Sequence, residues 1–280
     1  MRARLFEQKL TRVRKAFAII MLSTFMATGI ISCSNNKSLL VTEIKVSPPS
    51  RRIAKASNAG DFYIQGQSQH VKGDSQAAIA AYTQAISLNP NYAEAYNSRG
   101  LAYFDLGNKQ GAIADYNEAI RINPNFAEPY NNRGNARAAQ GDSNNAIADY
   151  TEAIRINPNY AEAYNNRGNA RSVMKDINGA IDDFDQAILL DSRYAIAYNN
   201  RGNARAANGD PQAAIADYNE AIRLNPNFAP AYNNRGNARA ANNDKQGAIA
   251  DLQRAATIFE QENNRQLYQE VMNNLKELGQ

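Results

Sequence analysis

The chain has very few of the side chains that most often bind metals or carry out covalent chemistry. Its 280 residues include one cysteine, one histidine and no tryptophan. A single cysteine excludes an internal disulfide, and one Cys with one His cannot supply the ligands of a Cys/His zinc site. The one histidine, His70, has no partners that would form a catalytic triad. The sequence therefore predicts a protein that is not an enzyme and has no metal or cofactor.

Positive charge is also scarce once the N-terminus is set aside. The whole chain has a net charge of +4, but residues 59–280 contain 20 basic and 25 acidic residues, a net charge of −5. Nucleic-acid binding depends on clustered positive charge that displaces the counterions of phosphates. The sequence therefore excludes nucleic acid as the expected partner, whereas 44% hydrophobic residues indicate a folded chain.

The N-terminus has the pattern of an export signal. Residues 1–15 are basic, residues 16–32 are uncharged and apolar, and the run ends in Ile30-Ile31-Ser32-Cys33. This order is typical of a signal peptide, and the apolar run is short for a spanning helix. The last four residues resemble the lipobox of bacterial lipoproteins. The alternative is an uncleaved signal anchor with an incidental cysteine.

The lipobox resemblance implies how the chain is processed and where it is found. It implies cleavage after Ser32 and lipidation of Cys33, with the mature protein exported and anchored to a bacterial membrane. Ser34 follows the cysteine, which favours the outer membrane and a periplasm-facing protein, because Asp there would favour retention in the inner membrane. Residues 33–58 have no sustained period and contain Pro48-Pro49, so we expect a lipidated tether.

The rest of the chain is an internal repeat of 34 residues. The octapeptide YNNRGNAR begins at Tyr130, Tyr164, Tyr198 and Tyr232, and a looser copy begins at Tyr96. This period divides the chain into six units, 59–92, 93–126, 127–160, 161–194, 195–228 and 229–262. The second unit has the pattern residues Tyr96, Gly100, Tyr103, Ala112, Tyr116, Ala119 and Pro124. Period and pattern resemble the tetratricopeptide repeat (TPR) family.

The resemblance implies an all-α solenoid of six helix–turn–helix repeats. The first residue of each unit is counted as position 1. In four units the first helix is expected to end at a glycine at position 15. In all six units Asp or Asn at position 16 is expected to begin the second helix. The second helix ends at an Asn-Pro-Asn sequence in most units. Unit four lacks this proline, so we expect a different angle at its junction with unit five. Residues 263–280 have one apolar stripe and are predicted to form a capping helix.

The two arginines of the octapeptide lie on or beside the packed face of the first helix. Arg at position 7 and Asp at position 23 occur together in units two to six, and unit one has neither, with Gln65 and Ala81 at these positions. We therefore predict structural ion pairs, with the guanidinium near the ring at position 24. The predicted pairs are Arg99–Asp115, Arg133–Asp149, Arg167–Asp183, Arg201–Asp217 and Arg235–Asp251. An arginine ladder for phosphate is the weaker interpretation.

The asparagines of the octapeptide point away from the packed face on a helical wheel. In the TPR family, the first helices line a concave groove, and the resemblance places positions 6 and 9 in it. The predicted partner-binding residues are Asn132, Asn135, Asn166, Asn169, Asn200, Asn203, Asn234 and Asn237. Amide side chains both donate and accept hydrogen bonds, so they suit the backbone of an extended segment. The alternative is that they only solvate a polar face.

The leading hypothesis is a membrane-anchored scaffold that binds a protein or peptide partner in this groove. Assembly of an envelope or membrane complex is one role that fits. Two alternatives stay open: a self-associating structural lipoprotein that forms homo-oligomers, and an assembly factor for photosynthetic membrane complexes.

Overall fold

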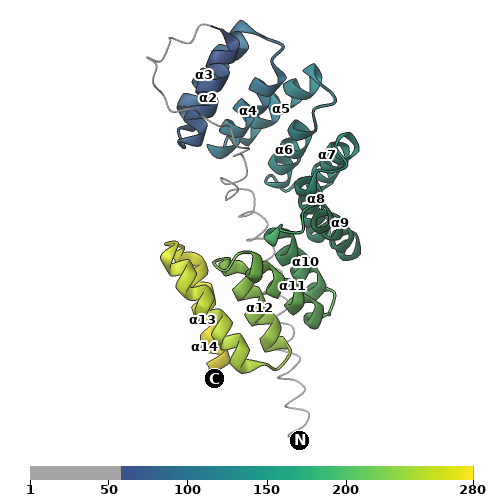
Figure 1. Ribbon diagram of the computed structural model, residues 1–280, viewed down its shortest axis with the longest axis vertical. Coiled ribbons are helices and arrows are strands. Elements are labelled where there is room, and N and C mark those ends of the chain that lie inside the picture. Colours follow the sequence, from purple (N-terminus) through teal and green to yellow (C-terminus); the bar gives the residue numbers. More distant parts are fainter. Residues whose placement is uncertain (1–57, 280) are drawn as a thin grey trace, which may run out of the picture. The chain divides into compact units, whose positions relative to one another are not determined.

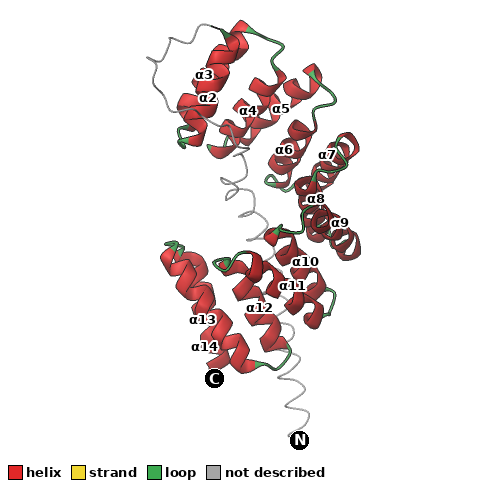
Figure 2. Ribbon diagram, in the orientation of Figure 1, coloured by secondary structure: helices red, strands yellow, loops and turns green. Residues whose placement is uncertain are grey.

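The computed structural model describes residues 58–279, and all regular structure in this range is helical (Figure 2). The signal, Cys33 and the tether lie outside the described residues. The first helices of the repeats are α2 (Ala59–Val71), α4 (Ala93–Asp105), α6 (Ala127–Ala138), α8 (Ala161–Val173), α10 (Ala195–Ala207) and α12 (Ala229–Ala241). The second helices are α3 (Ser75–Leu88), α5 (Lys109–Ile122), α7 (Ser143–Ile156), α9 (Ile177–Leu190), α11 (Pro211–Leu224) and α13 (Lys245–Gln261). The last helix is α14 (Arg265–Gly279).

The described chain divides into two compact units, which we call the N-terminal unit (58–166) and the C-terminal unit (167–279). In both, first helices pack antiparallel against the second helix of their own repeat, as α6 does against α7 and α12 against α13, and second helices pack against a following first helix, as α5 does against α6 and α11 against α12 (Figure 1). The prediction of an all-α fold with helix–turn–helix repeats is confirmed. Within residues 58–279, no helix is long and apolar enough to cross a membrane.

The helix ends follow from local chemistry, as expected. Four turns have glycine at position 15 with a positive φ, for example Gly141 at 85°, where a side chain would be strained. Lys175 and Asn243 adopt the same left-handed conformation in the other two turns inside repeats. Each following Asp or Asn caps the second helix, and Asp142 Oδ1 accepts from the backbone of Asn145.

The turn after α9 lacks proline but keeps the conformation of the turns that have it. Asp191 ends α9 with φ −134° and ψ 94°, almost the values of Asn123 before a proline, −132° and 92°. The Asp191 carboxylate accepts from the backbone of Arg193, as the Asn123 amide accepts from Asn125. The backbone of this turn therefore matches that of a turn with proline, because the side chain at position 31 makes the same hydrogen bond, and a different angle between units four and five stays a prediction.

The core combines alanine with one large side chain in each repeat. Alanines at positions 20 and 27 of the second helices are fully buried, including Ala146 and Ala153. The large side chain at position 24 lies over the glycine at position 8, so that a Cβ added to Gly134 would lie 2.6 Å from Tyr150 Cε1. Small residues therefore let the two helices approach closely, and the ring fills the space that remains.

The C-terminus has an additional helix. As predicted, α13 extends beyond Phe259 and is three residues longer than the 14-residue second helices before it. The next helix, α14, packs against α13 and buries Leu267 and Val271. Asn274 Nδ2 donates to Asn237 Oδ1 at 3.5 Å. This helix covers part of the face that a seventh repeat would cover.

The contact between Gly134 and Tyr150 predicts the effect of one added methyl group. Gly134→Ala places Cβ inside the contact distance of a buried ring, so we expect the variant to be less stable by about 1–3 kcal/mol. Urea unfolding followed by circular dichroism measures this. Gly279→Ala is the control, because its Cβ would meet no atom within 4 Å. Equal midpoints for the two variants would contradict this account of the packing.

Candidate functional site

In each of the second to sixth repeats, a bidentate ion pair links the first helix to the second. Arg133 Nε donates to Asp149 Oδ2 at 3.0 Å, and Arg133 Nη2 donates to Asp149 Oδ1 at 2.6 Å. The carboxylate is buried, and the guanidinium is mostly buried. The same bidentate ion pair joins Arg99 to Asp115, Arg167 to Asp183, Arg201 to Asp217 and Arg235 to Asp251. The hydrogen bonds that Arg99 donates to Asp115 hold the pKa of the Arg99 guanidinium above its usual value.

The second arginine of the octapeptide, at position 11, contacts the same carboxylate, which the sequence analysis did not predict. Arg137 Nη1 donates to Asp149 Oδ2 at 2.7 Å. Arg171, Arg205 and Arg239 bind the Asp at position 23 of their own repeats in the same way. Each of these carboxylates therefore lies between two guanidinium groups. The sequence could have indicated this contact, because the arginine at position 11 lies one helical turn after the arginine at position 7, on the same face of the first helix.

The aromatic neighbour of the position 7 arginine is not the predicted one. The guanidinium of Arg133 lies over the ring of Tyr130, 5.5 Å from its centre. This tyrosine is at position 4, one turn earlier on the same helix, whereas the ring at position 24 packs on glycine. Arg99, Arg201 and Arg235 lie over Tyr96, Tyr198 and Tyr232 in the same way. The prediction was wrong because a helical wheel shows only the directions of side chains around the first helix. It does not show how close a ring of the second helix lies to the guanidinium.

The position 7 arginine also reaches the preceding repeat. Arg133 Nη1 donates to Asn117 Oδ1 at 2.6 Å, and Arg201 Nη1 donates to Asp185 Oδ1 at the same distance. Arg99 contacts Thr83, and Arg235 contacts Asn219. The acceptor is always at position 25 of the repeat before. All three nitrogens of these guanidinium groups thus donate to protein acceptors, which argues against a phosphate-binding ladder.

The asparagines at position 6 form hydrogen bonds between neighbouring first helices. Asn132 Nδ2 donates to Asn97 Oδ1 at 2.9 Å, and Asn166 Nδ2 donates to Asn131 Oδ1 at 3.1 Å. In the C-terminal unit, Asn234 donates to Asn199 at 3.0 Å. Asn166, Asn200 and Asn234 are buried, whereas Asn132 is partly exposed. This ladder therefore stabilises the stack, and its contact with a partner stays a prediction.

The asparagines at position 9 contact the ring residue of their own repeat where that residue is tyrosine. Tyr150 Oη donates to Asn135 Oδ1, and Tyr218 Oη donates to Asn203 Oδ1, each at 2.8 Å. Burial raises the pKa of the Tyr218 hydroxyl. Asn169 belongs to the repeat with Phe184, which has no hydroxyl to donate. Asn203 and Asn237 are buried, and Asn135 and Asn169 keep part of their surface exposed.

Charged side chains also lie on the first helices of the N-terminal unit. His70 Nε2 lies 2.7 Å from Asp105 Oδ2, which links position 12 of the first repeat to position 13 of the second. Glu162, at position 2 of the fourth repeat, is partly buried against Asn131 and Asn166. Burial raises the pKa of the Glu162 carboxyl, and the two amides oppose this shift by favouring the carboxylate. These residues form no nucleophile–base pair.

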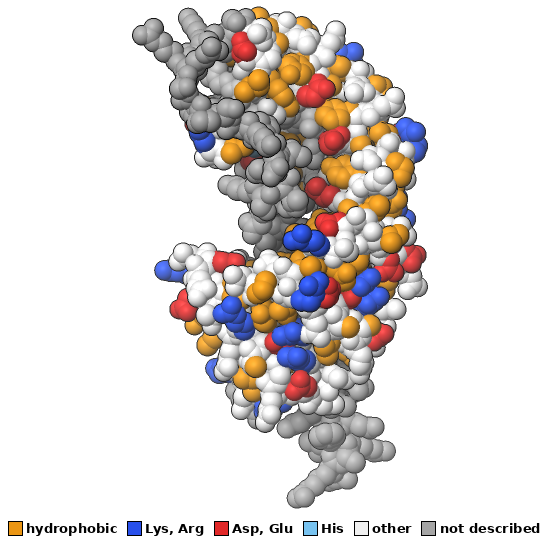
Figure 3. Space-filling view, viewed as in Figure 1, with side chains coloured by type: hydrophobic (Ala, Val, Ile, Leu, Met, Phe, Trp, Pro, Cys, Tyr) orange, Lys and Arg blue, Asp and Glu red, His pale blue; other side chains and the backbone are white. Residues whose placement is uncertain are grey.

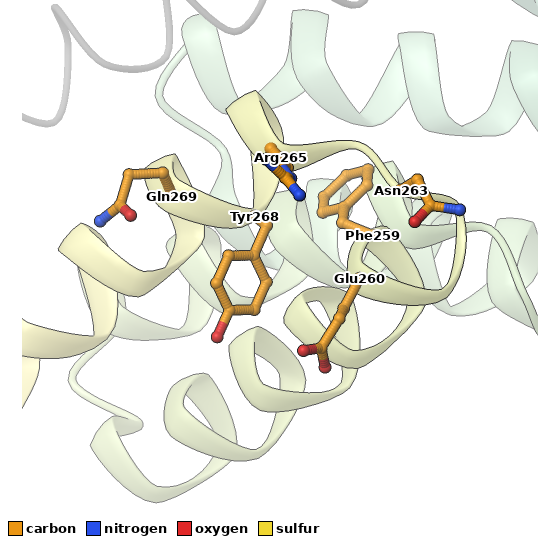
Figure 4. A pocket seen from close by; sticks show the side chains of 6 residues that line it. All are labelled: Phe259, Glu260, Asn263, Arg265, Tyr268 and Gln269. Atoms are coloured by element: carbon orange, nitrogen blue, oxygen red, sulfur yellow. The ribbon is translucent and has the colours of Figure 1, made fainter.

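A shallow depression of about 450 Å³ lies at the turn between α13 and α14 (Figure 4). Phe259, Glu260, Asn263, Arg265, Tyr268 and Gln269 line it. The six side chains come from two helix ends and the turn between them, and they do not converge on one point. The depression is therefore the open seam beside the last helix, and its residues do not form a catalytic arrangement.

The shared carboxylate predicts which residues the repeats depend on. Asp149→Asn removes the negative charge between Arg133 and Arg137, so we expect a loss of about 3 kcal/mol of unfolding free energy. Glu152→Gln is the matched control, because Glu152 and Arg155 form an exposed pair that contributes little. Chemical denaturation of both variants measures the difference. A loss for Asp149→Asn no larger than the control's would contradict a structural role of this ion pair.

Comparison with protein families gives matches along most of the described chain. A model described as "TPR repeat" matches residues 66–107, 100–141 and 134–172. Models described as "Tetratricopeptide repeat" match residues 161–194, 195–228 and 217–250. Together the matches run without a gap from residue 66 to residue 250. A comparison with curated proteins found no match.

Solved structures give the same fold. A crystal structure of MamA is 27% identical, with a TM-score of 0.52 over 59% of this chain and 96% of that chain. YrrB, titled "a TPR protein with an unusual peptide-binding site", is 21% identical, with a TM-score of 0.52 over 64% of this chain and 92% of that chain. In the Cut9–Hcn1 assembly, the similar chain is 18% identical, with a TM-score of 0.70 over 93% of this chain and 48% of that chain. The six repeats, the close packing of their position 8 glycines and these matches lead to one conclusion: the chain belongs to the tetratricopeptide repeat family.

Proposed function

We propose that this protein is a scaffold that binds a segment of a protein partner on the face made by its first helices. A lipid on Cys33 holds it at a bacterial membrane, preferentially the outer membrane. Repeat proteins of this architecture use such extended faces to bind partners. Two separate arguments support the proposal, one from the described helices and one from the N-terminal sequence.

The observation that carries partner binding is the accessibility of small residues near the ends of the first helices. Ala138 and Ala139 at positions 12 and 13 are partly exposed, whereas Ala136, two residues earlier, is fully buried. Ala206 and Ala240 at position 12 are also partly exposed, in the C-terminal unit. Short side chains on an accessible helix face leave room for a bound segment and impose little side-chain selectivity.

Polar groups beside these alanines supply hydrogen-bonding capacity. Asn132, Asn135 and Asn169 are partly exposed, so they are the predicted contact residues that keep free surface. An amide group provides two donors and an acceptor with two lone pairs, and each hydrogen bond described above uses only part of this capacity. Asn166, Asn200, Asn203, Asn234 and Asn237 are buried, so we expect them to act mainly by holding their neighbours in place.

The membrane anchor is argued from residues 1–33. The basic segment, the short apolar run and the cysteine directly after it occur in the order that export and lipidation require. Lipidation also explains a single cysteine in an exported chain, because such a protein otherwise carries an unpaired thiol.

Site-specific photocrosslinking tests partner binding. A benzophenone side chain in place of Ala138 lies on the first-helix face, and the same group in place of Ala114 lies on the exposed side of α5. We expect the Ala138 position to give a discrete adduct with one protein in native membranes, because that face contacts the partner. Adducts that are absent, or identical from both positions, would count against the first-helix face as the binding surface.

The anchor is tested by replacing the cysteine that receives the lipid. We expect Cys33→Ser to leave the protein as an unprocessed precursor or to release it from the membrane fraction, because the thiol is the point of attachment. Fractionation and labelling with a radioactive fatty acid measure this. Ser34→Ala is the control and keeps the label. Normal processing and membrane association of Cys33→Ser would refute lipidation.

A further inference from the structure

The N-terminal unit and the segment that precedes it have opposite charges of equal size. Residues 58–166 contain seven basic and eleven acidic residues, a net charge of −4. Residues 33–57 contain five basic residues and one acidic residue, a net charge of +4. On the face shown in Figure 3, the part formed by α2 to α7 carries red acidic side chains and few blue basic ones. The charge of the unit is therefore available at its surface.

Three glutamates of this unit occupy the same position in successive repeats. Glu94, Glu128 and Glu162 are at position 2, in the first turn of α4, α6 and α8. Glu94 and Glu128 are exposed, and none of the three forms an ion pair within residues 58–279. In contrast, Glu118 and Glu152 on the second helices are paired with arginines three residues later. The position 2 glutamates thus form an acidic row without a cationic partner in the described chain.

A buried and unsatisfied amide lies beside one end of this row. Asn131 is fully buried, and its Oδ1 accepts from Asn166. Its side chain is close enough to Glu162 to favour the carboxylate, yet Nδ2 makes no hydrogen bond of normal geometry to a described residue. An unpaired buried donor costs free energy, so this site favours an additional acceptor such as a backbone carbonyl.

The row begins at the edge where the chain enters the first repeat. The first helices of successive repeats are parallel, because each repeat reverses the chain direction twice. Asn58, the N-cap of α2, therefore lies at the same edge as the glutamates. Neighbouring helices are on the order of 10 Å apart, which places the three glutamates about 10, 20 and 30 Å from that entry point.

The basic residues before Asn58 match these separations. An extended chain spans about 3.4 Å per residue, so Lys55 reaches about 10 Å and Arg51 about 24 Å. Lys45, beyond Pro48-Pro49, reaches well past 30 Å.

We propose that residues 45–57 bind along the acidic row of the N-terminal unit, with Lys55 near Glu94, Arg51 and Arg52 near Glu128, and a backbone carbonyl on Asn131 Nδ2. The contact is intramolecular and does not require the partner proposed above. It shortens the free tether between Cys33 and the repeats, and it occupies the rim of the first-helix face in the absence of a competing basic segment.

Tryptic cleavage of the full chain in detergent tests this contact, because trypsin cuts after Arg51, Arg52 and Lys55. We compare the wild type with E94Q/E128Q/E162Q and with the control E118Q/E152Q/E220Q, which removes the same charge from the second helices. We expect cleavage at 51–55, measured by mass spectrometry, to be at least 5-fold faster in the first variant. Raising NaCl from 0.1 to 0.5 M has the same effect on the wild type, and the control remains protected.

Three outcomes would overturn the proposal. Equal cleavage of the two variants means that the acidic row does not hold the segment. Protection that falls on tenfold dilution identifies the segment of a second copy as the occupant. Rapid cleavage of the wild type in low salt leaves the row free for an external basic partner. Thermal melting followed by circular dichroism shows that each variant is folded, and E94Q/E128Q replaces the triple variant if Glu162→Gln unfolds the chain.

Discussion

The carboxylate at position 23 is the group on which the repeats depend. In the third repeat it accepts hydrogen bonds from two arginines of the partner helix, and one of these also binds position 25 of the preceding repeat. One buried anion therefore joins three helices. An ion pair with one carboxylate and one guanidinium often gains little after desolvation, but additional hydrogen bonds to the remaining donors offset that cost. Neighbouring repeats are thus held by polar contacts in addition to a small alanine-rich core.

The glycine–ring contact explains why such a core is sufficient. The absence of a side chain at position 8 brings the helices close enough for a single ring to fill the gap, as Tyr150 does over Gly134. The alanines around it lose little conformational entropy on burial. The tyrosine hydroxyl then meets the amide at position 9, so the largest core residue also satisfies a polar one. The first repeat keeps the contact between glycine and the ring but lacks the ion pair, because Gln65 and Ala81 occupy positions 7 and 23.

Sequence periodicity was sufficient to predict the fold and the helix ends, because these depend on residues a few positions apart. The joint presence of arginine and aspartate pointed to contacts such as Arg133–Asp149 within one repeat. It did not indicate Asn117 as a third partner, since that contact depends on the distance between repeats. The asparagines show the same limit. A helical wheel places Asn166 away from its own second helix, but it cannot show that the first helix of the preceding repeat covers it.

The asparagine ladder has a direction, because position 6 donates and position 5 of the preceding repeat accepts. Asn132 binds back to Asn97, Asn166 binds back to Asn131, and Asn234 binds back to Asn199. During synthesis the N-terminal repeats emerge from the ribosome first. Each repeat that follows brings a donor to an acceptor that is already in place, so the last folded repeat of a partly synthesised chain presents one position 5 amide oxygen without its donor. Growth of the array therefore requires no rearrangement of the repeats that are already folded.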